Sequence, residues 1–336
     1  MSEFKLSVLD HASVSEGSTP GQALRAVREL AQHAERLGYT RFWLSEHHNM
    51  QAIASAATSV ALGFVAEGTS TIRVGAGGVM LPNHSPLVIA EQFGTLESLY
   101  PGRIDLGLGR APGTDPRTMA ALRRDHNAAA SFPRDVQELQ AYFEPAQENQ
   151  AVRAVPGEGL RVPLWILGSS LFGAQLAAHL GLPYSFASHF APDALYEAVR
   201  VYRETFQPSE QLARPYVMLG ANAFVADTDE EAQRLFTTMQ QAFLGTVRGA
   251  RGLLQPPVDS MDTAWRPGER ERLDHMLRYS FVGSPETVRR KLELFVTDTG
   301  ADEVMVSSMI YDQEARLRSY ELLARAAELP GSTGRG

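Results

Sequence analysis

Short apolar runs of strand length alternate with helix-length segments along this chain, and this alternation constrains the fold more than any other feature. The expected strands cover 4–9, 41–44, 72–80, 104–108, 163–167, 184–187, 216–225 and 304–308. The helices expected between and after them cover 21–37, 52–66, 86–99, 133–146, 171–180, 191–206, 228–245, 284–297 and 313–329. Parallel strands need a long crossover connection, usually a helix, so the repeated order predicts a parallel sheet.

Eight strand–helix pairs in one α/β chain predict a closed (β/α)₈ TIM barrel, in which functional residues follow the carboxyl ends of the strands. A doubly wound open sheet is the alternative. The barrel is favoured because no change in composition marks a domain boundary and no glycine fingerprint follows the first strand. Insertions interrupt the pattern after strands four (113–134) and seven (249–267). We therefore expect a single domain over 1–330 and a flexible tail at 331–336.

Composition excludes several classes of protein and several kinds of site. With 336 residues, 44% hydrophobic and 21% charged, the chain can bury one large core and is neither fibrous nor disordered. The absence of cysteine excludes disulfides, thiolate zinc sites and a cysteine nucleophile. A net charge of −8 lacks the excess of basic residues that is typical of nucleic-acid-binding proteins. No signal peptide or membrane-spanning run is visible, so we expect a cytoplasmic protein without membrane contact.

Two adjacent histidines, His47 and His48, follow the second expected strand within Glu46-His47-His48-Asn49. Imidazole titrates near neutrality, so histidines at a barrel mouth can act as general acid or base. The alternative is that they are only polar residues at the start of a helix. Their spacing is not that of a metal site, so no metal is expected. His84, after the third strand, is expected to be a structural hydrogen-bonding residue.

Glycines and one arginine mark the ends of the third and fourth strands. Gly77 and Gly78 stand inside a strand, which indicates either a bulge with close approach of a ligand or a tight barrel corner. Arg110 ends the fourth strand, where its guanidinium can bind a phosphate. Glycines near it permit the backbone to approach a ligand closely.

A second candidate phosphate-binding segment follows the fifth expected strand. Ser169, Ser170 and Gly173 lead into a helix, where backbone N–H groups and the helix dipole favour an anion. The alternative is an ordinary serine cap of that helix. The position of this turn after a late strand, together with Arg110, favours phosphate.

These residues resemble the bacterial luciferase-like, flavin-dependent monooxygenase family. The resemblance extends over nearly the whole chain and implies a (β/α)₈ barrel that binds reduced FMN at the strand carboxyl ends. Its most specific segments are LSEHHN (44–49), VGAGGVMLPNHSPL (74–87), GRIDLGLGRAPG (102–113), PLWILGSS with LGLPYSFASHF (163–190) and RYSFVGSPETV (278–288).

The resemblance also implies roles for individual residues. His47 corresponds to the family's active-site histidine and His48 to its neighbour. The Gly77-Gly78 pair corresponds to a dipeptide whose non-proline cis bond lies behind the isoalloxazine ring. Gly109 falls where luciferase has a reactive cysteine, so light emission with a long aldehyde is not expected.

The flavin phosphate is assigned by the same resemblance to two places in the chain. Arg110 corresponds to the family's phosphate-binding arginine. Ser169, Ser170 and Gly173 correspond to its late phosphate loop.

The implied activity is that of a two-component monooxygenase, which uses reduced FMN and O₂ on an unidentified small organic substrate. A separate NAD(P)H flavin reductase would supply the reduced FMN, because no dinucleotide fingerprint is visible. The insertion at 113–134 is expected to act as a lid. A homodimer is expected through the helices after strands two and three, where the alanines of 52–66 would permit close helix contact. The alternatives are a deazaflavin-dependent hydride-transfer oxidoreductase and a non-enzymatic flavin-binding protein.

Overall fold

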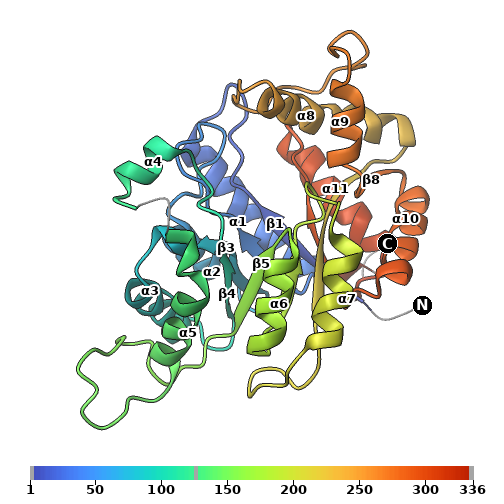
Figure 1. Ribbon diagram of the computed structural model, residues 1–336. Helices are drawn as coiled ribbons and strands as arrows, with labels where there is room; N and C mark the ends of the chain where they lie inside the picture. Colours follow the sequence, from blue (N-terminus) through green and yellow to red (C-terminus); the bar gives the residue numbers. More distant parts are fainter. Residues whose placement is uncertain (1–3, 125–127, 333–336) are drawn as a thin grey trace.

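The computed structural model in Figure 1 describes residues 4–124 and 128–332 and confirms the closed parallel barrel. Neighbouring strands pair in chain order from β1 to β7, β7 pairs with β9, and β9 pairs with β1, which closes the ring. The ring strands are β1 (Lys5–Asp10), β2 (Arg41–Leu44), β3 (Arg73–Met80), β4 (Ile104–Gly109), β5 (Leu164–Gly168), β6 (Tyr184–Phe186), β7 (Val217–Val225) and β9 (Glu303–Ser307).

Helices surround the strands, as Figure 1 shows. Within the described ranges, none of them is long and apolar enough to cross a membrane. They are α1 (Pro20–Leu37), α2 (Thr58–Glu67), α3 (Pro86–Leu99), α4 (Pro116–Ala121), α5 (Phe132–Phe143), α6 (Leu171–Leu180), α7 (Leu195–Thr205), α8 (Asp229–Val247), α9 (Glu269–Met276), α10 (Pro285–Thr299) and α11 (Gln313–Ala326). Short 3₁₀ turns occur at η1 (Leu81–Asn83), η2 (Ala128–Ala130) and η3 (Pro330–Ser332).

The first helix shows how local sequence sets these boundaries. Thr19 caps α1 by accepting a hydrogen bond from the backbone N–H of Gln22, whose side chain accepts from the Thr19 backbone in return. Gly38 ends the helix in the left-handed conformation, which glycine adopts without steric cost. The buried stripe between these ends, which includes Leu30 and Ala34, packs against the barrel.

The prediction of a helix over 52–66 was wrong in its first half, because α2 begins only at Thr58. The residues before Thr58 lie along the loop that comes after β1. Ile53 pairs with Ser13 in an isolated antiparallel bridge, and the Ser55 hydroxyl donates to the His11 carbonyl. These contacts with a distant segment replace the hydrogen bonds that a helix would make.

The segment at 278–283 was assigned to no strand or helix from the sequence, but it contains the extra strand β8 (Ser280–Gly283). β8 pairs with β7 from Asn222 onward, beyond Leu219, where the pairing of β7 with β6 ends. The tail expected at 331–336 begins as the turn η3, and its last residues, 333–336, lie outside the described part of the chain.

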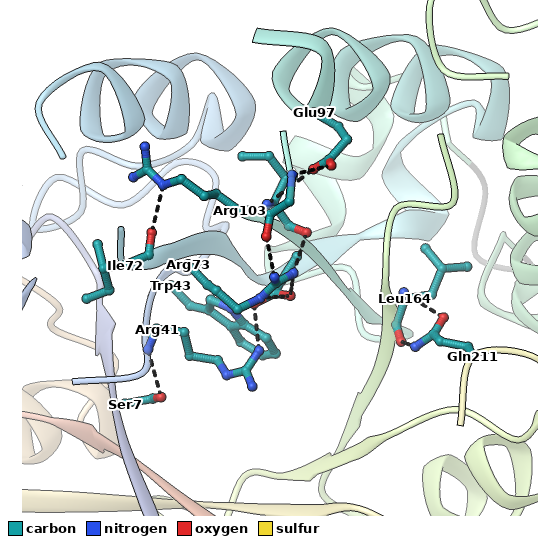
Figure 2. A network of polar contacts seen from close by, with 12 residues as sticks. Ser7, Arg41, Trp43, Ile72, Arg73, Glu97, Arg103, Leu164 and Gln211 are labelled. Carbon is teal, nitrogen blue, oxygen red and sulfur yellow. Dashed lines mark hydrogen bonds and ion pairs between the residues drawn. The ribbon is translucent and has the colours of Figure 1, made fainter. Parts of the chain in front are cut away.

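Buried charges fill the amino-terminal end of the barrel, where Figure 2 shows the side chains of Ser7, Arg41, Trp43 and Arg73. The Arg41 guanidinium lies 2.7 Å from carboxylate oxygens of both Asp105 and Glu303. Arg73 lies 2.6 Å from Asp105, so two cations neutralise two anions inside the ring. Because an unpaired buried charge is strongly destabilising, this network depends on all four members.

An apolar layer lies above the charged network and closes the barrel beneath its carboxyl end. It consists of Leu9, Trp43, Trp165, Met218 and Met305. Trp43 and Trp165 pack edge to face, with ring centroids 5.2 Å apart. Two filled layers leave the carboxyl end of the strands as the place where a ligand can enter.

Candidate active site

A cavity of about 210 Å³ lies at the carboxyl ends of the ring strands, above the apolar layer. All predicted site residues except His48 line it: His47, Gly77, Gly78, Arg110, Ser169, Ser170 and Gly173. Further lining side chains are mostly apolar, and the described part of the lining contains no carboxylate. The cavity therefore combines one cation with a surface that excludes water.

One end of the cavity is suited to a phosphate. The Arg110 guanidinium lies 4.1 Å from the ring centre of Phe172, and Arg110 has no ion-pair partner in the ranges that the structure covers. Ser170 precedes α6 without a side-chain cap, which leaves N–H groups of the first turn free. A free guanidinium, serine hydroxyls and a helix amino terminus thus meet at one place, as phosphate binding requires.

His47 lies at the cavity and is tied to the insertion after β4. Its Nδ1 is 3.4 Å from the carbonyl oxygen of Gly113. Burial lowers the pKa of His47 below its usual 6.5, although the Gly113 carbonyl opposes this shift. The imidazole is therefore uncharged at neutral pH and can accept a proton.

His48 points away from the cavity and contacts Glu46 instead. Nε2 of His48 lies 2.7 Å from the Glu46 carboxylate, and Nε2 of His84 lies 2.8 Å from the same oxygen. The backbone N–H of Met80 donates to the other carboxylate oxygen at 3.1 Å. Side chains alternate in direction beyond the end of β2, so adjacent histidines face opposite ways. His84 is a hydrogen-bonding residue here, as expected.

The Glu46 cluster also sets the charges of its members. Burial raises the pKa of Glu46, but hydrogen bonds from His48, His84 and the Met80 N–H outweigh burial and lower this pKa to about 2. The hydrogen bond to Glu46 raises the pKa of His48. Three donor atoms of Glu46, His48 and His84 lie within 4.8 Å of one another, the number that an open metal site offers. Their oxygen–nitrogen distances are those of hydrogen bonds, so the three groups satisfy one another without an ion.

Two further histidines line the cavity, and the sequence reasoning missed both. His11 follows β1, and its Nδ1 lies 2.8 Å from the Ser45 hydroxyl. Burial, with a smaller effect of His47, lowers the pKa of His11 to about 4. His189 follows β6, and burial lowers its pKa to about 3. Both come shortly after a strand, and His189 also lies in the segment LGLPYSFASHF that carries the family resemblance.

The first residues of the insertion expected at 113–134 contact the segment after β2 that contains His47 and His48. Asp115 caps α4, and its carboxylate accepts from the Asn49 side chain at 3.1 Å. The Thr114 hydroxyl donates to the His48 carbonyl at 3.3 Å. In Figure 1, α4 projects from the edge of the barrel. Residues 125–127 of this insertion lie outside the described ranges.

The glycines of β3 form one wall of the cavity. The Gly77–Gly78 peptide bond is cis, as the resemblance implied. Pairing with β4 shifts register between Ala76 and Val79, which confirms the predicted bulge. A Cβ atom would clash with Leu9 at Gly77 and with the Gly107 carbonyl oxygen at Gly78, so this wall is bare backbone, which an isoalloxazine ring can approach closely. Together with the phosphate end, the residues present suit FMN.

Comparisons with known proteins identify the family of this chain. The sequence profile of the family described as luciferase-like monooxygenase matches residues 3–303. A protein of Escherichia coli K12 named luciferase-like monooxygenase is 54% identical over 317 residues, which cover 94% of this chain and 95% of that protein. The N-acetyl-S-alkylcysteine monooxygenase of Bacillus subtilis is 36% identical over 238 residues, covering 69% and 70% of the two chains.

Solved structures give the same fold. The crystal structure of apo-MsnO8 is similar with a TM-score of 0.90 and 40% identity, and covers 97% of this chain and 99% of that one. At 19% identity and a TM-score of 0.73, the fold is shared with the oxygenating constituent of 3,6-diketocamphane monooxygenase from Pseudomonas putida, solved with FMN, over 98% of both chains. A coenzyme F420-dependent reductase from Methanopyrus kandleri shares it at 18% identity and a TM-score of 0.68, over 97% of this chain and 98% of that one.

Proposed function

The chain belongs to the luciferase-like monooxygenase family, and from that premise we propose that it is the oxygenating component of a two-component, FMN-dependent monooxygenase. The observation that carries the proposal is the joint presence, at one cavity, of a free cation beside a helix amino terminus and of the buried imidazole of His47. The first suits the phosphate of FMN, and the second suits proton transfer.

Each part of the cavity has a role in this reaction. Reduced FMN, when bound, supplies the electrons with which O₂ is activated. Arg110, Ser169, Ser170 and the start of α6 would hold its phosphate, while Gly77 and Gly78 would face its ring. The apolar lining excludes water and so protects the reaction from loss of reducing equivalents. His47 would take a proton from the substrate or return one to the reacting oxygen.

The reducing equivalents come from a second protein in this proposal. The sequence carries no dinucleotide fingerprint with which this chain could bind NAD(P)H itself. A NAD(P)H flavin reductase would therefore release reduced FMN, which this chain binds. The segment Gly113–Ala121, which contacts the backbone after β2, would close over the bound ring as a lid.

We also propose that the chain is a homodimer through α2 and α3, which lie next to each other in Figure 1. These helices expose four large apolar side chains: Val60, Phe64, Val88 and Leu99. Val60 is 74% exposed and Leu99 is 64% exposed, which is costly on a surface that nothing covers. The alanines before Thr58, expected to support this contact, lie outside α2.

The experiment that tests the proposal combines the protein with FMN, NADH, a flavin reductase and a panel of small organic substrates under ¹⁸O₂. A product that contains one ¹⁸O atom, found by mass spectrometry and absent without this protein, is the expected result. Oxidation of a reduced deazaflavin without O₂ would establish the hydride-transfer alternative. Flavin binding with no turnover across the panel would favour a binding protein.

A further inference from the structure

His189 has two ring nitrogens without a hydrogen-bond partner in the described chain. Its Nδ1 is buried and unpartnered, and the residue as a whole is only 9% exposed. Its Nε2 also makes no hydrogen bond to a described residue, and the ring lines the cavity. Nδ1 is enclosed next to Gly220, so Nε2 is the ring nitrogen that a ligand in the cavity can reach.

The surroundings of His189 fix the position of its ring. The Asn222 side chain donates to the His189 carbonyl at 2.8 Å, and the Ser188 hydroxyl donates to the Gly220 carbonyl at 2.6 Å. Both hydrogen bonds tie the segment after β6 to β7. The Phe190 ring packs edge to face on the imidazole, with centroids 4.8 Å apart.

Gly220 makes room for this imidazole. A Cβ atom at position 220 would clash with Nδ1 of His189, so a glycine is needed beneath the ring. Since Nδ1 has no acceptor within reach, an N–H there would be left unsatisfied, and the proton belongs on Nε2. His189 thus presents an uncharged N–H donor to the cavity. The titratable group that acts on it is His11, itself uncharged at neutral pH.

We propose that His189 is a flavin-binding residue, which donates a hydrogen bond from Nε2 to an acceptor atom on the polar half of the isoalloxazine ring. This inference rests on the proposed function. The position favours flavin over substrate, because β6 is the neighbour of β5, whose carboxyl end begins the phosphate site at Ser169. His47 and His11 follow β2 and β1, neither of which is a neighbour of β6 in the ring of strands.

The test measures FMN affinity by titration of flavin fluorescence, with His189→Leu, His189→Gln and the matched control His179→Leu, an exposed histidine on α6. Loss of one buried hydrogen bond is expected to weaken FMN by roughly tenfold in the leucine variant. Glutamine, which retains an N–H donor, is expected to restore part of the affinity. The control is expected to bind as the unaltered protein does.

A second variant tests the same idea without altering the histidine. Gly220→Ala is expected to displace the ring and weaken FMN as much as His189→Leu does. The double variant His189→Ala/Gly220→Ala is then expected to bind FMN as His189→Ala does, because an alanine at position 189 leaves no ring for the new methyl group to displace. The thermal unfolding midpoint of each variant is measured to check that the barrel remains folded.

Three outcomes separate this inference from the proposed function. If the unaltered protein does not bind FMN, both fail. If it binds FMN and Arg110→Ala weakens binding while the His189 and Gly220 variants do not, only the role of His189 is overturned. Unchanged FMN affinity combined with a raised KM for the organic substrate would reassign His189 to substrate binding and also overturn it.

Discussion

The guanidinium of Arg110 lies 4.1 Å from the ring centre of Phe172 and joins the end of β4 to the first turn of α6. Cation–π contacts of this kind hold a guanidinium in place without neutralising it. The charge therefore remains available to a ligand. The side chain is oriented before any anion arrives, which lowers the entropy lost on binding.

Replacement of Arg110 by alanine is expected to weaken FMN binding. A hydrogen bond to a charged group contributes about 1.5–3 kcal/mol, so the Kd should rise roughly tenfold or more. Titration of flavin fluorescence measures this change. The control is Arg134→Ala, since the Arg134 side chain is 80% exposed on α5. Equal affinity in the Arg110 variant and the control would remove Arg110 from the site.

The pH dependence of turnover is expected to reflect protonation of the His47 imidazole. Its pKa lies below 6.5 because of burial, so the imidazole is uncharged at pH 7. As pH falls through this lowered pKa, His47 gains a proton, and kcat/KM should decline with a midpoint below pH 6.5. His47→Asn should lower the rate by about 10²–10⁴ and abolish this acidic limb. A limb that persists in the variant would assign it to another group.

Glu46 is expected to stabilise the fold in a pH-dependent way. Its pKa falls from 4.5 to about 2 on folding, which corresponds to about 3 kcal/mol. A lowered carboxyl pKa contributes stability above pH 4.5, and this contribution is lost as pH falls toward 2. In urea unfolding, the free energy of unfolding of Glu46→Gln should therefore be much lower than that of the unaltered protein at pH 7, and the difference should shrink by pH 3. The exposed Glu204 offers a control, because Glu204→Gln should change stability little. A deficit that does not change with pH would contradict this account.

The regular parts of the barrel could be predicted because each strand is a compact apolar run with a periodic helix after it. β2, α3 and α6 match their predicted bounds. β8 was not predicted, because its four residues between two polar segments are too few to show an alternation of apolar and polar side chains. The first half of 52–66 was misassigned because its partner, the loop after β1, is distant in sequence, and local apolar content gives no sign of that pairing.

The candidate site could be predicted only where residues form a recognisable local pattern. Arg110 and the start of α6 lie at strand ends, and both line the cavity. His47 and His48 share one motif, yet only the first faces the cavity, since side-chain direction depends on the backbone beyond β2. His11 and His189 are far apart in the sequence, and closure of the barrel brings both to one cavity.

The oligomeric state is expected to depend on α2 and α3. The protein should be a dimer at micromolar concentration by light scattering, and Val60→Glu/Leu99→Glu should be a monomer, because burying two carboxylates in an apolar contact is costly. Leu294→Glu on α10 is the control, since Leu294 is 59% exposed. A monomeric mass for the unaltered protein would contradict the proposal.

The central claim, that this cavity binds reduced FMN through its phosphate, is tested most directly by anaerobic titration with reduced FMN and with reduced riboflavin. The account predicts saturable binding of one reduced FMN per chain, with riboflavin weaker by roughly tenfold or more. This difference should nearly vanish in Arg110→Ala. Equal affinity for the two flavins in the unaltered protein, or no saturable binding of reduced FMN, would contradict the account.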